Sequence, residues 1–135
     1  MTFILVPSEY EKVRGFLLET VPGFTDSIEY DTLNEVEREL TGVVCGAFTR
    51  FFTRFQEEER REGSLSERDA WTLECAYHAI DLLAQSGDEE VRTVLKDEVF
   101  ENLDCGRECM ALIRSRLEPQ SQVLFDAVWN DSEPP

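Results

Sequence analysis

The stretch LNEVERELTGVVCGAFTRFFTRF, residues 33–55, decides the fold of this chain. Its apolar residues recur at steps of three and four, which keeps them on one face of an α-helix. We predict a helix from about residue 33 through the charged segment 56–62, ending at Gly63, because glycine readily adopts the left-handed conformation that ends helices. The apolar positions are Leu33, Val36, Leu40, Val43, Val44, Ala47, Phe48, Phe51 and Phe55.

The opposite side of this helix carries only small residues. Each glycine inside a helix costs about 1 kcal/mol relative to alanine, so we expect another element to pack closely against this side. That element is either another helix of the same domain or a helix of a partner protein. The small residues are Gly42, Cys45, Gly46, Thr49 and Thr53.

Two further helices are predicted from their start signals. A capping box at residues 8–11 starts a helix that runs to about Thr20. Ser66, followed by acidic residues, caps a helix that runs to about Gln85. Apolar residues surround most of the axis of this second helix, which is typical of a central helix.

The C-terminal part contains three more helix signals. Acidic residues 88–90 are suited to the first turn of a helix, and apolar positions extend that helix as far as residue 104. Phe100 falls outside the apolar arc, which leaves the continuity of this helix open. Two short helices follow, one over 106–117 and one from Pro119, a residue tolerated in a first helical turn.

The chain is therefore predicted to be all-α. No strand alternation competes with the helical pattern, and short connections favour antiparallel neighbours. With 135 residues, we expect one domain, 1–135, with about five to seven helices and a frayed end from about residue 131. An irregular bundle and a short stack of antiparallel helix pairs both fit this pattern.

The net charge of the chain favours some classes of binding partner over others. The chain has 29 Asp and Glu against 13 Lys and Arg, a formal net charge of -16. Such a charge repels nucleic acid and anionic lipid and speeds association with a basic surface, although it also serves solubility alone. We expect no membrane span, no secretory signal, a cytoplasmic location and reduced thiols at all four cysteines.

Two acidic ridges are the candidate binding surface for a basic partner. One ridge lies on the predicted helix 66–85, beside Trp71, and the other lies on the predicted helix 88–104. If these helices pack antiparallel, both ridges share one surface; the alternative is a solvated outer face with a buried Trp71. The first ridge comprises Glu67, Glu74, His78 and Asp81, and the second comprises Glu90, Asp97, Glu101 and Asp104.

The sequence offers little for catalysis. His78 is its single histidine, and no nucleophile and base are paired by a known motif. One zinc set can be written, Cys75 and His78 with Cys105 and Cys109, but it lacks the common knuckle spacing. We therefore expect no cofactor, no metal and no enzymatic activity.

The chain as a whole resembles small acidic immunity proteins of bacterial polymorphic toxin systems. Its segment SGDEEV at 86–91, with the apolar pairs at 94–95 and 99–100 and the run 101–103, resembles a helix pair in small bacterial families often found in such toxin loci. This resemblance implies an inhibitor that binds a basic toxin domain and covers its active site. Two alternatives remain. One is a helical adaptor or regulatory scaffold that uses the Gly42 and Gly46 face to bind another protein or a second copy of itself in a homodimer. The other is an enzyme or zinc protein with an unrecognised site.

Overall fold

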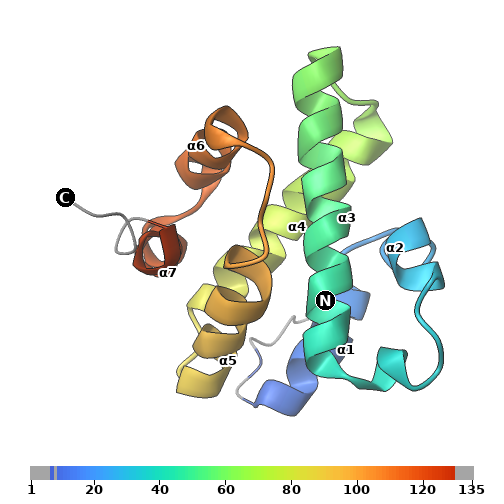
Figure 1. The fold of residues 1–135 in the computed structure, drawn as a ribbon, viewed down its shortest axis with the longest axis vertical. Helices are drawn as coiled ribbons and strands as arrows, with labels where there is room; N and C mark the ends of the chain where they lie inside the picture. Colours follow the sequence, from blue (N-terminus) through green and yellow to red (C-terminus); the bar gives the residue numbers. More distant parts are fainter. Residues whose placement is uncertain (1–6, 8, 130–135) are drawn as a thin grey trace, which may run out of the picture.

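The computed structural model describes residue 7 and residues 9–129, and within these residues the chain is all-α, as predicted (Figure 1). Seven α-helices and two short helical segments, η1 and η2, occur in this part of the chain, and no strand does. Their bounds are α1 Tyr10–Thr20, α2 Ile28–Asp31, η1 Glu37–Glu39, α3 Thr41–Glu62, α4 Glu67–Ala84, α5 Glu89–Val94, η2 Leu95–Phe100, α6 Arg107–Arg116 and α7 Pro119–Trp129.

Helices α3 and α4 form the centre of an irregular bundle. In Figure 1, α4 turns back at the top and crosses behind α3, while α6 and α7 lie on one side of this pair and α2 on the other. Helix α4 contacts α1, α3, α5, η2 and α7, which confirms the prediction of a central helix. No described helix combines the length and the apolar character needed to cross a bilayer.

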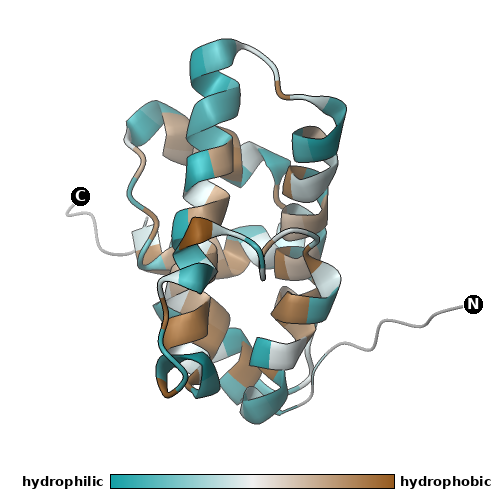
Figure 2. Cartoon of the chain, turned by 90° about the vertical axis from the view of Figure 1, so that its right-hand side faces the viewer, coloured by the Kyte–Doolittle hydropathy of each residue, from teal (hydrophilic) through white to brown (hydrophobic). Residues whose placement is uncertain are grey.

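Aromatic rings from α3 fill much of the core. Phe48, Phe51 and Phe52 are buried and contact Phe24, the loop residue that follows α1, and Tyr77 of α4. Their ring centroids lie 4.9 to 5.7 Å apart, a separation at which aromatic pairs attract one another. Figure 2 shows hydrophilic residues where α3 ends and α4 begins, at the top of the view, away from this aromatic core.

Most predicted helix ends are confirmed. Gly63 ends α3 in a left-handed conformation with φ 82°. The Ser66 hydroxyl accepts a hydrogen bond from the Asp69 amide at 3.2 Å and caps α4. The Asp88 carboxylate caps α5 in the same way, through the Val91 amide. Ser8 and the predicted frayed end from residue 131 lie outside the described residues.

The predicted start of the long helix near residue 33 is wrong. Helix α3 begins at Thr41, after Leu40 in an extended conformation. Val36 is 71% exposed and Leu40 is 50% exposed, so the apolar period before Thr41 does not form a buried helical face. The prediction also missed α2, which lies in the segment 24–40.

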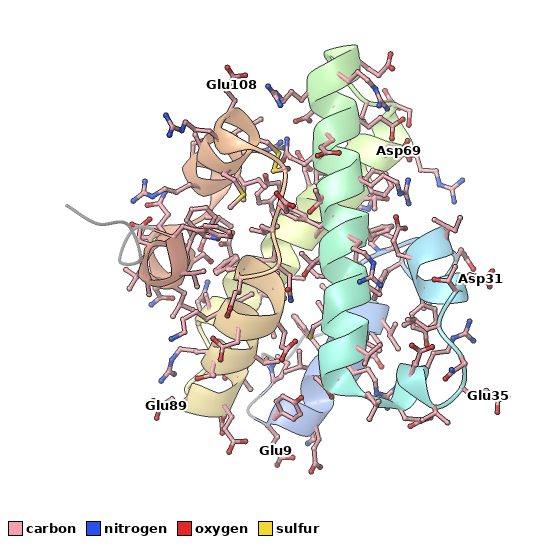
Figure 3. The ribbon with its side chains drawn as sticks, viewed as in Figure 1. Glu9, Asp31, Glu35, Asp69, Glu89 and Glu108 are labelled. Atoms are coloured by element: carbon pink, nitrogen blue, oxygen red, sulfur yellow. A yellow bond between two sulfur atoms is a disulfide. The ribbon has the colours of Figure 1, made fainter. Side chains whose placement is uncertain are left out.

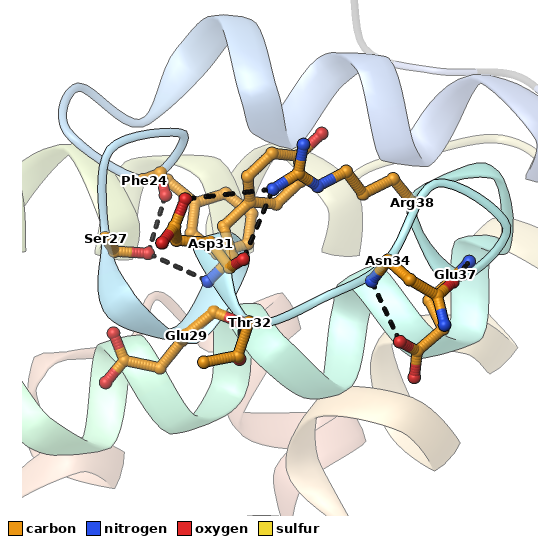
Figure 4. Close-up of polar contacts among 9 residues, drawn as sticks. Phe24, Ser27, Glu29, Asp31, Thr32, Asn34, Glu37 and Arg38 are labelled. Atoms are coloured by element: carbon orange, nitrogen blue, oxygen red, sulfur yellow. Dashed lines mark hydrogen bonds and ion pairs between the residues drawn. The ribbon is translucent and has the colours of Figure 1, made fainter.

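Polar contacts within the segment 24–40 fix its conformation (Figure 4). Asn34 and Glu37 exchange two hydrogen bonds between side chains and backbone amides, at 2.8 and 2.9 Å. These reciprocal bonds start a separate short turn, η1, because each satisfies an amide that would otherwise lack a partner. The Arg38 guanidinium lies over the Tyr30 ring, 4.7 Å from its centroid. The local hydrogen bonds of the Asn34–Glu37 turn therefore decide the structure here, and the apolar period does not extend α3 back to residue 33.

A π-helical segment, η2, continues α5. The Glu101 amide donates to the Lys96 carbonyl five residues earlier, at 2.9 Å. This wider turn contains one residue more than an α-helical turn, so it changes the direction in which the following side chains point. Phe100, which an α-helix would place outside the apolar arc, is buried as a result. The predicted continuous α-helix from 88 to 104 is therefore corrected to α5 followed by η2.

Segment η2 packs against the small side of α3. A Cβ atom at Gly42 would lie 3.5 Å from the Glu98 side chain. The Thr49 hydroxyl donates to the Cys45 carbonyl at 2.9 Å and lies 3.4 Å from the Glu98 carbonyl oxygen. The expectation of close packing by another helical element of the same domain is thus confirmed.

Candidate functional site

The exposed side of α4 carries most of the first predicted ridge. Glu67, Glu74 and His78 are exposed. Trp71 lies among them with 61% of its surface exposed, which excludes the alternative of a buried tryptophan. An exposed tryptophan flanked by carboxylates has the composition of a protein-binding hot spot.

Asp81 does not belong to this exposed strip, and its assignment to the binding surface is corrected. Its side chain is buried and accepts hydrogen bonds from the Ser121 hydroxyl at 2.5 Å and from the Glu118 amide at 3.1 Å. Both donors lie at the start of α7, which packs on α4 at this point. Helical spacing alone could not show that a later helix covers Asp81.

The second predicted ridge is exposed but divided. Glu90, Asp97, Glu101 and Asp104 are all exposed. Because η2 is π-helical and ends at Phe100, the four side chains do not follow one α-helical row. Asp104 instead borders a different hollow, which Arg50 and Arg54 of α3 also line.

The hollows beside the second ridge do not include the first ridge. The hollows that contain Glu90, Asp97 or Glu101 are completed by Tyr10 of α1 and by Trp129 of α7, and no residue of α4 lines them. Labelled carboxylates in Figure 3, such as Glu9, Glu89 and Glu108, also lie around the whole outline of the molecule. Acidic residues are thus spread over several faces.

Four carboxylates gather at a hollow between the start of α1 and the outer side of α5 and η2, here called the α1–α5 hollow. Its volume is about 490 Å³. Tyr10, which is 38% exposed, contributes an aromatic ring at one edge. Its lining consists of Tyr10, Glu89, Glu90, Thr93, Val94, Asp97 and Glu98.

No carboxylate of the α1–α5 hollow forms an ion pair with a described residue. Arginines elsewhere do pair with acids. Burial, the largest single effect, would raise the pKa of Glu29, but the hydrogen bonds from Arg54 at 2.7 and 3.0 Å, a backbone hydrogen bond and the charges of Arg54 and Arg50 together lower this pKa. The hollow therefore concentrates negative charge that the described part of the chain leaves without a bound cation.

The cysteines differ from the expectation of four reduced thiols. Cys105 and Cys109 form a disulfide, which closes across the first turn of α6, and Cys45 and Cys75 are free. Burial, aided by the negative charge of Glu98, raises the pKa of Cys45 to about 12. Burial and Glu74 also raise the pKa of Cys75.

The disulfide removes the zinc set that the sequence allowed. Sulfur atoms joined in a disulfide are not thiolates, which are the form that binds zinc. Among residues 7 and 9–129, no group of three or more His, Cys, Asp or Glu side chains is arranged to hold a metal ion.

Sequence reasoning identified Glu90 and Asp97 of the hollow but missed Tyr10, Glu89 and Glu98. Tyr10 and α5 are far apart in the sequence and meet only because α1 packs against α5. Glu89 was interpreted as a helix-start residue, which is the ordinary role of acid in a first turn. No pattern in the sequence pairs these residues.

Comparisons with known proteins leave the site to be interpreted from its geometry. No family model, no curated protein and no solved structure matches the chain.

Proposed function

We propose that this protein is an acidic inhibitor of a basic partner protein, most consistent with an immunity protein that neutralises a bacterial toxin domain by covering its active site. The α1–α5 hollow carries the proposal, because its four carboxylates have no ion-pair partner among the described residues. The toxin, the cytoplasmic location and the bacterial origin remain predictions of the sequence.

The hollow suits the side chain of a partner lysine or arginine. Its volume, about 490 Å³, is large enough for one such side chain. Carboxylates would bind the positive head group, while the exposed Tyr10 ring offers a cation–π contact worth about 0.5 to 1 kcal/mol at such an exposed site. Glu90 and Asp97 lie at the solvent-exposed edge, where a partner first meets them.

Exposed ion pairs add little binding energy but strongly affect the rate of encounter. Each exposed pair contributes about 0 to 1 kcal/mol, because water and salt screen it. A net charge of -16 nevertheless attracts a basic surface from a distance and speeds association. Inhibition would follow by occlusion, since bound acids occupy the lysines and arginines that the toxin uses for its own anionic substrate.

The test is affinity capture from the native cell with two charge-reversed baits. One bait carries Glu90→Lys and Asp97→Lys. The matched control carries Glu19→Lys and Asp26→Lys, two exposed residues outside the hollow with the same change of net charge. A protein that the wild type and the control capture, and the hollow variant does not, is the candidate partner.

The captured protein is then expressed alone and with each variant. We expect it to be basic and toxic, and we expect the hollow variant to associate about tenfold more slowly and to protect less well than the control. Equal capture, equal rates and equal protection by both variants would remove the α1–α5 hollow from the proposal. A captured partner that is acidic or harmless would contradict the inhibitor function.

No observation favours the alternative of an adaptor that binds through the Gly42 face. The Glu98 side chain and the rest of η2 cover Gly42, Cys45 and Thr49, so this part of the Gly42 and Gly46 face packs inside the domain, whereas only the Arg50 side chain approaches Gly46.

A further inference from the structure

The disulfide at the start of α6 presents its two sulfur atoms unequally. Cys105 precedes the helix and is 8% exposed, whereas Cys109 lies in its first turn and is fully buried. A hollow of about 420 Å³ is lined by Cys105 but not by Cys109. We propose that this disulfide is a thiol–disulfide exchange site, open at Cys105 to a small anionic thiol.

The hollow beside Cys105 has apolar walls. Leu103, Met110, Phe125 and Trp129 line it, and the Trp129 indole is held by a hydrogen bond to the Phe100 carbonyl at 2.8 Å. These walls admit the carbon chain of a low-molecular-weight thiol and leave its sulfur facing Cys105. Access to one sulfur only determines which of the two is attacked, since exchange needs approach to the attacked atom.

Positive charge near this hollow suits an anionic thiol. Arg107 lines the hollow and forms no ion pair with any described residue. Arg114 also lines it but is paired with Asp126 through two hydrogen bonds of 2.7 Å. Because Asp104 and the net charge of -16 repel anions, Arg107 is the group that attracts a carboxylate-bearing thiol to this place.

The position of Cys109 suits a leaving group. It is the third residue of α6, where the partial positive charge of the helix N-terminus stabilises a thiolate. The acidic neighbour Glu108 is paired with Arg60 at 2.5 Å. Attack at the better-exposed Cys105 therefore expels the Cys109 sulfur at the helix N-terminus, whose partial positive charge offsets part of the cost of a buried thiolate.

The proposed exchange takes place in two steps. The thiolate of the small molecule attacks the Cys105 sulfur, which forms a mixed disulfide and breaks the bond to Cys109. Cys109 leaves as a thiolate and takes a proton from solvent. A second small thiolate then attacks the mixed disulfide at the small molecule's sulfur, releasing the Cys105 thiolate, which is protonated, and an oxidised dimer of the small thiol. The small thiol supplies both electrons.

The first experiment measures reduction of the intact protein by two matched reagents, mercaptopropionate, which is anionic, and mercaptoethanol, which is neutral. Arg107→Glu is compared with Arg68→Glu, an exposed control on α4 with the same change of charge. Alkylation and peptide mass spectrometry follow the Cys105–Cys109 disulfide. We expect Arg107→Glu to slow reduction by mercaptopropionate about fivefold and to leave reduction by mercaptoethanol unchanged. Equal effects on both reagents, equal effects of both variants, or a disulfide that neither reagent reduces would overturn the proposal.

The second experiment identifies the attacked sulfur. In a background in which both free cysteines are removed, Cys45→Ala and Cys75→Ala, Cys109→Ser leaves Cys105 as a single thiol, and Cys105→Ser leaves Cys109. Both variants are treated with the oxidised dimer of mercaptopropionate. We expect a mixed disulfide on Cys105 to form at least about tenfold faster than on Cys109, because Cys109 is buried. Faster modification of Cys109 would overturn the assignment.

Discussion

The buried carboxylate of Asp81 accepts a hydrogen bond from the buried hydroxyl of Ser121, with 2.5 Å between the two oxygen atoms. The same carboxylate oxygen accepts from the Glu118 amide at 3.1 Å. Asp81 on α4 thereby binds the start of α7, a helix that begins 38 residues later in the chain. A negative charge at this position also complements the positive end of the helix dipole.

Replacement of Asp81 by alanine is expected to destabilise the fold rather than weaken binding. The free energy of unfolding should fall by about 1 to 3 kcal/mol, because the Ser121 hydroxyl and the Glu118 amide lose their acceptor. Urea denaturation followed by circular dichroism measures this change. Glu74→Ala, at an exposed position of the same helix, is the control and should stay within about 0.5 kcal/mol of the wild type. Equal stability of the two variants would contradict the role of Asp81.

The Arg114–Asp126 pair predicts a specific dependence on pH. Hydrogen bonds from Arg114 lower the pKa of Asp126 below its usual 3.8. A carboxylate with a lowered pKa adds stability that is present above the unfolded pKa and is lost as the pH falls through the folded pKa. Wild type should therefore be more stable than Asp126→Asn at neutral pH, with a difference that shrinks as the pH falls below 3.8 and disappears below the lowered pKa of folded Asp126. A difference that stays constant down to about pH 2 would show that its cause is not the charge.

Two glycines of α3 should respond to alanine with opposite signs. Gly46 lies inside the helix, and a Cβ there meets only the Arg50 side chain at 3.6 Å, so Gly46→Ala should stabilise by about 0.5 to 1 kcal/mol. Gly63 has φ 82°, which alanine disfavours, so Gly63→Ala should destabilise by about 1 kcal/mol. Midpoints of thermal unfolding test both signs, and a change in the same direction for both variants would contradict this interpretation.

Trp71 should matter for binding and not for folding. Since 61% of its surface is exposed, Trp71→Ala should change the free energy of unfolding by less than about 0.5 kcal/mol. If α4 joins the α1–α5 hollow in contacting the partner, affinity should fall by about 2 kcal/mol or more, as for other tryptophan hot spots. Calorimetric titration with the captured partner measures this loss. Unchanged affinity would limit the contact to the α1–α5 hollow.

Helix ends with short-range signals could be predicted from the sequence. Gly63, Ser66 and Asp88 act within four residues of their own position, through backbone conformation or a single capping bond. The start of α3 could not be predicted from its apolar period. Val36 and Leu40 match that period, but the competing Asn34–Glu37 turn places them in solvent.

The candidate site was predicted only in part, because exposure depends on what later elements cover. Glu90 and Asp97 were identified from their spacing and are exposed. Asp81 has the same spacing on α4, but α7 covers it. Tyr10 joins the hollow only through the packing of α1 on α5.

By itself the sequence determined the all-α class, the central place of α4, most helix ends and a net charge of -16, since these depend on residue type and on neighbours within one or two turns. Only the tertiary structure decided the π-helical register that buries Phe100, the closure of the Cys105–Cys109 disulfide and the gathering of carboxylates beside Tyr10. These features require segments to meet in space, and the free energy of that packing belongs to the whole core rather than to any short stretch of sequence.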